Sequence, residues 1–250
     1  KDNFPYIIDI QNNILKSLGK QSQILIPNDS PLFLNWLNGL DSAVYFNKSS
    51  KKVTESLNSS DLVICLDFNT IVRTESMKEV LEKCPVPKIM IDHHPDPDNY
   101  AEISISETKV SSTAELLYHV LCACDYDKYI NVDSAESIYC GINTDTVGLK
   151  HNVSNPYTFQ TVASLLKYKP DYEKIHRLVY DNWSYQRMLL LGNCLSQRFI
   201  IMPEYKTAYI YITAEDQKKY NFQQGDSEGI VNYPLSVEGI RFSALFTEKK

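Results

Sequence analysis

Short apolar segments alternate with helical segments along the first 170 residues, and this alternation constrains the fold more than any other feature. Residues 62–66 (LVICL) and 88–91 (KIMI) are almost continuously apolar, which is typical of parallel strands that are covered on both faces. Residues 75–83, 111–122 and 156–168 have helical patterns. The alternation predicts an α/β fold with a mostly parallel sheet flanked by helices.

The pattern changes after about residue 175. Residues 173–194 form a long, mostly helical stretch, whereas residues 206–213 and 239–246 alternate as strands with one exposed face do. These segments predict a smaller α+β domain at the C-terminal end. The domains that we predict are a catalytic domain over 1–175, a helical connector over 176–195 and a second domain over 196–250.

Composition excludes several classes of protein. Only 8 of the 250 residues are glycine, and no glycine-rich phosphate-binding motif occurs. The net charge of −6 argues against binding to long duplex DNA, which usually requires a basic surface. The apolar runs are too short to span a bilayer, and the first five residues have no signal-peptide pattern. Six cysteines without a C-x-x-C pair are typical of reduced thiols, so we expect a cytoplasmic protein with no membrane partner.

Polar side chains follow the apolar segments at the points where each is expected to end. Asp67 follows the first apolar run, and Asp92, His93 and His94 follow the second. Asp145 follows a third apolar stretch, residues 135–144, which we also expect to end as a strand. In an open α/β sheet, ligands bind outside the carboxyl ends of the strands. We therefore expect these side chains to converge on one crevice.

Each acidic residue also has a structural interpretation. Asp67 and Asp145 could each cap a turn, whereas two adjacent histidines are hard to satisfy together in a core. Carboxylates with imidazole, and without paired thiolates, suit Mn²⁺ or Mg²⁺. Two such ions, ~3.5–4 Å apart, are the common device for phosphoester hydrolysis. Asp67 is our candidate for a carboxylate that bridges them.

The segment 111–115 (SSTAE) opens a predicted helix. Ser112 and Glu115 have the spacing of a capping box, in which each side chain bonds the backbone of the other residue. The same helix start directs N–H groups toward a place where a phosphate could bind. We therefore predict substrate-binding roles for Ser111 and Ser112 in addition to the capping role.

The order of four short motifs resembles the DHH phosphoesterase family. These motifs are residues 66–69 (LDFN), 91–95 (IDHHP), 111–115 and 141–146 (GINTDT). The sequence is most similar to the NrnA-like branch, the oligoribonucleases (nanoRNases) that also dephosphorylate 3′-phosphoadenosine 5′-phosphate. Residues 225–232 (GDSEGIVN) resemble the start of that family's substrate-binding DHHA1 domain.

The resemblance implies a site with two Mn²⁺ ions, with Mg²⁺ or Co²⁺ as alternatives. By position, Asp67, His93 and Asp145 resemble metal ligands. His94 resembles the residue that contacts the scissile phosphate, and Asp92 a partner that orients an imidazole. The implied function is hydrolysis of short oligoribonucleotides or 3′-phosphoadenosine 5′-phosphate. Alternatives are a catalytically silent nucleotide-binding module, an exopolyphosphatase, a pyrophosphatase or a RecJ-like exonuclease, and a homodimer is compatible with the pattern.

Two glycine-rich motifs of the family are absent from the sequence. These are the first motif, His-x-x-Pro-Asp-Gly-Asp-Ala-x-Gly, which supplies metal ligands, and the C-terminal loop Gly-Gly-Gly-His-x-x-Ala-Ala-Gly. Either the sequence omits segments, so that the DHHA1-like domain is incomplete, or the protein has lost half of its metal site and has little or no activity. Buried carboxylates and imidazoles are costly without a metal to hold, which favours the first explanation.

Overall fold

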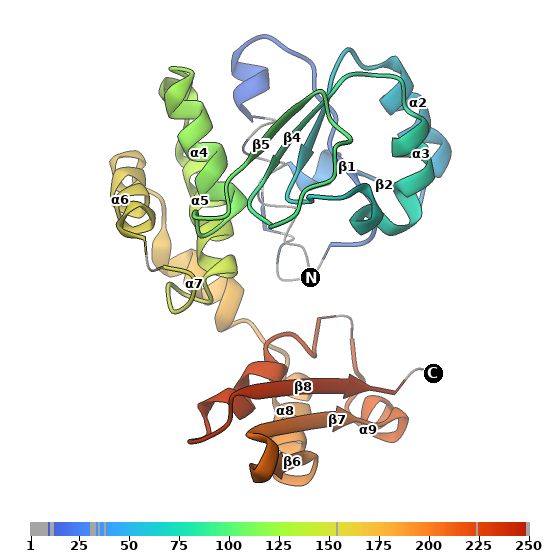
Figure 1. The fold of residues 1–250 in the computed structure, drawn as a ribbon, viewed down its shortest axis with the longest axis vertical. Coiled ribbons are helices and arrows are strands. Elements are labelled where there is room, and N and C mark those ends of the chain that lie inside the picture. The colour runs from blue at the N-terminus through green and yellow to red at the C-terminus, as the bar shows by residue number, and fades with distance from the viewer. Residues whose placement is uncertain are drawn as a thin grey trace. The chain divides into compact units, whose positions relative to one another are not determined.

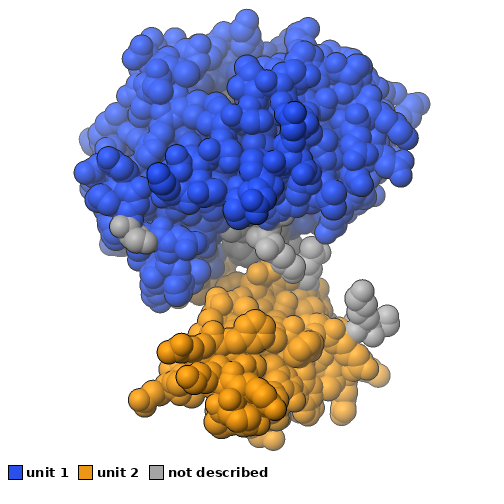
Figure 2. Space-filling view, viewed as in Figure 1, with its two compact units in different colours: residues 1–30, 34–179 blue, residues 31–33, 180–250 orange. Residues whose placement is uncertain are grey.

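The computed structural model describes residues 10, 13–30, 34, 36–37, 39–153, 155–223 and 225–248. It divides into two compact units (Figure 2). Unit 1 contains residues 1–30 and 34–179, and unit 2 contains residues 31–33 and 180–250. Within the described ranges, no helix has the length and apolar character needed to cross a membrane. The domain boundaries at residues 175 and 195 stay predictions.

The strands of unit 1 are all parallel among the described residues. β3 (Val63–Leu66) pairs with β4 (Lys88–Asp92), which pairs with β5 (Ile103–Ser106). A second, two-stranded sheet contains β1 (Leu25–Ile26) and β2 (Val44–Tyr45). The two strands predicted from the continuous apolar runs are confirmed: β4 lies in the centre of this sheet, and β3 lies at its edge.

Helices lie on both sides of this sheet (Figure 1). Buried side chains of α2 (Ser50–Ser59) and α3 (Lys78–Lys83) form a core with Cys65 of β3 and Met90 of β4. Helix α4 (Thr113–Ala123) also packs against β4. The predicted α/β architecture, with a parallel sheet flanked by helices, is therefore confirmed. The helices of unit 1 are α2 (Ser50–Ser59), α3 (Lys78–Lys83), α4 (Thr113–Ala123), α5 (Val132–Asp145), α6 (Pro156–Leu165) and α7 (Tyr172–Tyr180).

The prediction of a strand that ends at residue 144 is wrong. Residues 132–145 form helix α5, whose first turn is capped by the Asn131 side chain accepting a hydrogen bond from the Ser134 N–H. Every residue of this helix from Ser134 to Asn143 is buried. A helix that is covered on all sides has no polar stripe, so its apolar pattern cannot be distinguished from that of a buried strand.

The two sheets of unit 1 do not join into one among the described residues. Residues 20–25 and 27, around β1, and residues 59–66, which lead into β3, line the same cavity of about 750 Å³. The strands β1 and β3 therefore both border this cavity and are not paired with each other.

Unit 2 contains a mixed three-stranded sheet. β7 (Thr207–Ile212) lies in the centre, antiparallel to β6 (Phe199–Met202) and parallel to β8 (Phe242–Thr247). Helices α8 (Tyr185–Gln197) and α9 (Ala214–Lys219) complete the unit. The two strands predicted in this region, 206–213 and 239–246, correspond to β7 and β8, so this is an α+β arrangement.

The long helical stretch expected over 173–194 is two helices. α7 ends at Tyr180, and α8 starts after Ser184, whose hydroxyl accepts a hydrogen bond from the Arg187 N–H. A serine at this position accepts a hydrogen bond from a backbone N–H in the first turn of a helix. Ser184 therefore starts a new helix and does not lie inside a continuous one. Buried residues of α8 and β7 form the core of unit 2, among them Leu190, Cys194, Ile210 and Ile212.

All six cysteines are free, as expected from the lack of paired spacing. Cys65, Cys84, Cys140 and Cys194 are buried, whereas Cys124 is exposed.

Candidate metal centre

Asp67 is held where β3 ends. Its backbone has a positive φ of 67°, a left-handed conformation that aspartate tolerates better than most residues. The Asp67 N–H donates to the carbonyl of Ile91 on the neighbouring strand (3.1 Å). The Thr113 hydroxyl, in the first turn of α4, donates to Asp67 Oδ1 (2.6 Å). The carboxylate is only 2% exposed, so both its position and its environment are fixed by the sheet and by α4.

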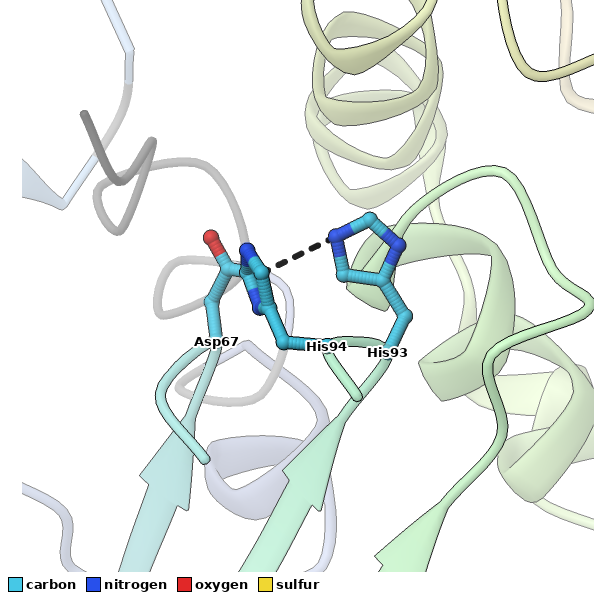
Figure 3. A group of neighbouring side chains, drawn as sticks. All are labelled: Asp67, His93 and His94. Atoms are coloured by element: carbon cyan, nitrogen blue, oxygen red, sulfur yellow. Dashed lines mark ion pairs between the residues drawn. The ribbon is translucent and has the colours of Figure 1, made fainter. Parts of the chain in front are cut away.

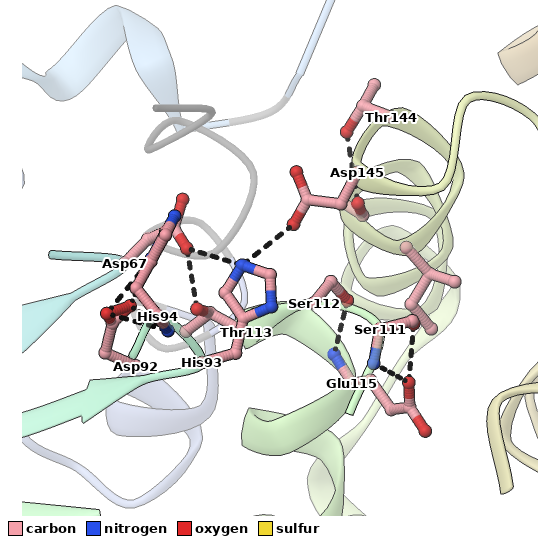
Figure 4. Close-up of polar contacts among 12 residues, drawn as sticks. Asp67, Asp92, His93, His94, Ser111, Ser112, Thr113, Glu115, Thr144 and Asp145 are labelled. Carbon is pink, nitrogen blue, oxygen red and sulfur yellow. Dashed lines mark hydrogen bonds and ion pairs between the residues drawn. The ribbon is translucent and has the colours of Figure 1, made fainter. Parts of the chain in front are cut away.

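His93 lies between two carboxylates (Figure 4). Its Nε2 atom is 3.8 Å from Asp67 Oδ1 and 3.9 Å from Asp145 Oδ2. Asp145 is the last residue of α5, so the carboxylates come from elements that are far apart in the sequence. The structure thus brings together the three residues that the resemblance implied as metal ligands, and that role stays a prediction.

Burial lowers the pKa of His93 below its ordinary value, and the neighbouring His94 and Arg73 lower it further, against the opposing effects of Asp92 and a backbone hydrogen bond with Val110. The imidazole is therefore neutral at pH 7. Neutral imidazole is the form that binds a metal ion, and carboxylate with imidazole is a donor set that divalent ions such as Mn²⁺ accept.

A second group of candidate ligands overlaps the first (Figure 3). Asp67, His93 and His94 each offer a ligand atom, and the three atoms lie within 4.8 Å of one another. Asp145 is adjacent to His93 but is not part of this tighter group. The two groups share Asp67 and His93, so these two residues are the centre of the candidate site in either arrangement.

His94 is oriented by Asp92. The Asp92 carboxylate is fully buried and lies 2.7 Å (Oδ1) and 3.1 Å (Oδ2) from His94 Nδ1. It also accepts hydrogen bonds from the His94 backbone N–H, at 3.3 Å to each oxygen. Such a carboxylate fixes the ring and its tautomer.

Arg73 completes this arrangement and was missed by the sequence analysis. Its Nη2 atom lies 3.2 Å from His94 Nε2. Because a guanidinium only donates, Nε2 accepts this hydrogen bond, and the ring proton is assigned to Nδ1, which donates to Asp92. A lone arginine four residues after the LDFN motif carries no periodic or motif signal of its own, so nothing in the pattern we used could have found it.

The start of α4 is capped differently from the prediction. The Ser112 hydroxyl accepts a hydrogen bond from the Glu115 N–H (3.0 Å), as predicted. The Glu115 carboxylate, however, accepts from the N–H and hydroxyl of Ser111 (2.9 and 2.5 Å) and from the Thr158 hydroxyl (2.9 Å), instead of closing a capping box on Ser112. Ser111 and Ser112 are both fully buried. Their hydroxyls form hydrogen bonds with Glu115 inside unit 1. Substrate binding by these residues stays a prediction.

An open pocket of about 990 Å³ lies over the candidate site. Its volume is at the upper end of the range for small-molecule sites. Besides His93, His94 and Asp145, its lining includes four polar residues that the sequence analysis did not select: Thr108, Lys109, Asn152 and Asn155. The pocket therefore offers one flexible cation and two amides close to the imidazoles.

Two curated proteins are similar to about two thirds of this chain. The chain is similar to the probable bifunctional oligoribonuclease and PAP phosphatase NrnA of Streptococcus mutans, with 27% identity over 161 residues that cover 64% of this chain and 50% of that protein. It is also similar to the bifunctional oligoribonuclease and PAP phosphatase NrnA of Bacillus subtilis, with 24% identity over 160 residues and the same coverage. The chain spans about half the length of these curated relatives.

A solved structure has the same fold. The crystal structure of an exopolyphosphatase-related protein from Bacteroides fragilis matches with a TM-score of 0.92 and 34% identity, over 96% of this chain and 70% of that chain. Residues 10–142 match the N-terminal domain of the DHH family, and this segment contains Asp67, Asp92, His93 and His94. The family predicted from the ordered motifs is therefore confirmed: the chain belongs to the DHH family.

Proposed function

We propose that this protein is a metal-dependent phosphoesterase that hydrolyses short oligoribonucleotides, 3′-phosphoadenosine 5′-phosphate, or both. The observation that carries the proposal is the position of His93 Nε2 between the carboxylates of Asp67 and Asp145. The names of the two NrnA relatives support the substrate class, since both are described as oligoribonucleases and PAP phosphatases.

The proposed ligands of the metal are Asp67, His93 and Asp145, and their chemistry fits a divalent ion. Two carboxylates lie on either side of a neutral imidazole, and Asp67 is held in place by Thr113. We propose Mn²⁺ as the ion, in a pair as the resemblance implies, and these residues account for part of the ligands of such a pair. Divalent ions of this kind stabilise charge on phosphoryl oxygens and lower the pKa of bound water.

The remaining residues of the site have proposed roles toward the substrate. His94 lines the pocket and is proposed to contact the scissile phosphate. Asp92 orients the His94 ring through the 2.7 Å contact with Nδ1. Lys109 on the pocket rim is suited to one additional phosphate, which favours a short substrate over a long polyanion. Unit 2 is proposed to be the DHHA1-like domain that binds the rest of the substrate.

A second candidate is hydrolysis of polyphosphate. It is favoured by one observation, the similarity to a solved protein described as exopolyphosphatase-related. Both candidates use the same ligands, so they differ in the substrate that the pocket accepts and not in the chemistry at the metal.

The test is an assay of the intact chain with Mn²⁺ on a diadenylate, on 3′-phosphoadenosine 5′-phosphate and on polyphosphate. We expect release of 5′-nucleotide or phosphate from at least one of the first two. Asp67→Asn preserves the shape of the side chain but removes its charge, so it should reduce both Mn²⁺ binding by isothermal titration calorimetry and turnover about a hundredfold or more. Asp133→Asn, at an exposed carboxylate in the first turn of α5, is the matched control.

Wild-type Mn²⁺ binding and turnover in Asp67→Asn would remove Asp67 from the site. Release of phosphate from polyphosphate alone would replace the proposed substrate class with the second candidate. An intact chain that binds no Mn²⁺ and hydrolyses none of the three substrates would contradict the proposal as a whole.

A further inference from the structure

The guanidinium of Arg73 lies against His94 Nε2, whereas the Asp92 carboxylate lies against Nδ1. We propose that Arg73 contacts the phosphoryl group of the substrate together with His94, as an additional binding residue of the site. The inference rests on the proposed function, because it assumes that a phosphate binds at His94. Neither the motifs in the sequence nor the family resemblance assigned a role to Arg73.

Hydrogen bonds to two described residues help to hold Arg73. Nη2 donates to His94 Nε2 (3.2 Å), and Nη1 donates to the Asn69 side-chain oxygen (3.4 Å). Asn69 is itself attached to the segment that follows the histidines, because its Nδ2 donates to the Pro95 carbonyl (2.5 Å). The loop after β3 and the loop after β4 are therefore tied together, and Arg73 is held beside the imidazole rather than extended into solvent.

The short distance between the two side chains places the guanidinium next to any phosphate at His94. Arg73 Nη2 is 3.2 Å from His94 Nε2, so a phosphoryl group in contact with the His94 ring also lies beside the guanidinium. Because Nε2 accepts the hydrogen bond from Nη2, the N–H groups of Arg73 are the donors of this pair that can bind a phosphoryl oxygen. The planar guanidinium is also the side chain best matched to the geometry of a phosphate group.

The charge of the site supports the same role. Asp67, Asp92 and Asp145 surround the two imidazoles, and each carries a carboxylate. A phosphate that enters among three carboxylates is repelled unless positive charge is close. Arg73 is a permanent cation, and its guanidinium is in direct contact with His94, which lines the pocket.

The competing interpretation is that Arg73 only holds the two loops in place. The two interpretations predict different patterns of binding. If Arg73 contacts phosphate, its loss weakens nucleotide binding but does not weaken metal binding, because removing a cation beside carboxylates favours another cation. If Arg73 is only structural, its loss disturbs Asp67 and His93 as well, and metal and nucleotide binding fall together.

The experiment compares the intact chain with Arg73→Gln, Arg73→Lys and the matched control Arg177→Gln, which removes an exposed arginine of α7. Isothermal titration calorimetry measures MnCl₂ binding first, and then 5′-AMP binding to the Mn²⁺-saturated protein. We expect Arg73→Gln to raise the Kd for 5′-AMP about tenfold or more, the loss of one charge-assisted hydrogen bond. Arg73→Lys should lose less because it keeps the charge. Mn²⁺ affinity should be unchanged or higher in both, and Arg177→Gln should match the wild type.

An unchanged Kd for 5′-AMP in Arg73→Gln overturns the inference and leaves the proposed function intact. A parallel loss of Mn²⁺ and 5′-AMP affinity also overturns it, in favour of a structural role. If the unmodified chain binds neither Mn²⁺ nor 5′-AMP and has no hydrolytic activity, the proposed function itself fails and this inference fails with it.

Discussion

Replacing Thr113 with valine tests whether the buried carboxylate of Asp67 holds a metal. Thr113 and Asp67 are 0% and 2% exposed, and the Thr113 hydroxyl donates to Asp67 Oδ1 at 2.6 Å. Valine has nearly the same shape, so the substitution removes one hydrogen bond without opening a large cavity. Thr113 is not among the residues that line the open pocket, which separates its effect from that of a direct ligand.

The magnitude follows from the charge and burial of Asp67. A hydrogen bond to a charged group is worth about 1.5–3 kcal/mol, which corresponds to a change of roughly 10–100-fold in an equilibrium constant. Partners of metal ligands typically affect metal affinity by a similar factor, about 10–100-fold. We therefore expect Thr113→Val to raise the Kd for Mn²⁺ by at least tenfold.

The assay is isothermal titration of MnCl₂ into the intact chain, with circular dichroism to show that the variant is folded. The matched control is Thr161→Val, at another buried threonine of unit 1, whose hydroxyl is paired with His119 (2.9 Å) instead of with a candidate ligand. Thr161→Val should bind Mn²⁺ as the wild type does. A folded Thr113→Val variant with wild-type affinity would refute the reasoning, since Asp67 would then not need its hydrogen bond to hold the ion.

Two further predictions concern stability. Burial raises the pKa of the Asp216 carboxyl, but hydrogen bonds from Arg198 and Thr213 outweigh this effect and hold the pKa at about 2, below its ordinary value of 3.8. The resulting stabilisation, roughly 2 kcal/mol, is present above about pH 4 and is lost as the pH falls toward 2. Denaturant unfolding should show Asp216→Asn to be less stable than the wild type by about that amount at pH 7 and by much less at pH 2, and a difference that does not shrink would contradict the assignment. Met90→Ala, at a 0% exposed position of β4, should cost about 2–5 kcal/mol of unfolding free energy in unit 1, whereas Met188→Ala, at a 51% exposed position of α8, should change it by less than about 0.5 kcal/mol. Equal shifts in the calorimetric transitions of these two variants would argue against the core described for unit 1.

The pattern of apolar and polar residues was sufficient to predict features that depend on a single strand or helix. The runs at 62–66 and 88–91 contain the strands β3 and β4, as predicted, because almost every residue in each run is apolar. Asp67 and the segment from Asp92 to His94 were correctly expected at strand ends, because a polar residue that directly follows an apolar run marks the point where the strand ends. The hydroxyl of Ser112 caps α4, as a serine at that position does in any helix.

The pattern of apolar and polar residues was insufficient to predict the type of an element that is buried on nearly all sides. Helix α5 is covered on nearly all sides, so its sequence has no amphipathic period and was taken for a strand. Asp145 still reaches His93, but it does so from a helix C-terminus and not from the edge of the sheet. The Glu115 carboxylate bonds Ser111 and Thr158 instead of completing a capping box, because Thr158 of α6 is packed against it in the folded chain.

The sequence by itself determined the family, the order of the strands and helices that carry the motifs, and the types of side chain that end them, since these depend on residues close together along the chain. Only the tertiary structure decided which of those side chains meet. His93 lies between Asp67 and Asp145 because β3, β4 and α5 end near one point, and Arg73 reaches His94 because the loops after β3 and β4 are tied together through Asn69. Each of these distances depends on the packing of elements 20 to 80 residues apart, and no local pattern of apolar and polar residues contains that information.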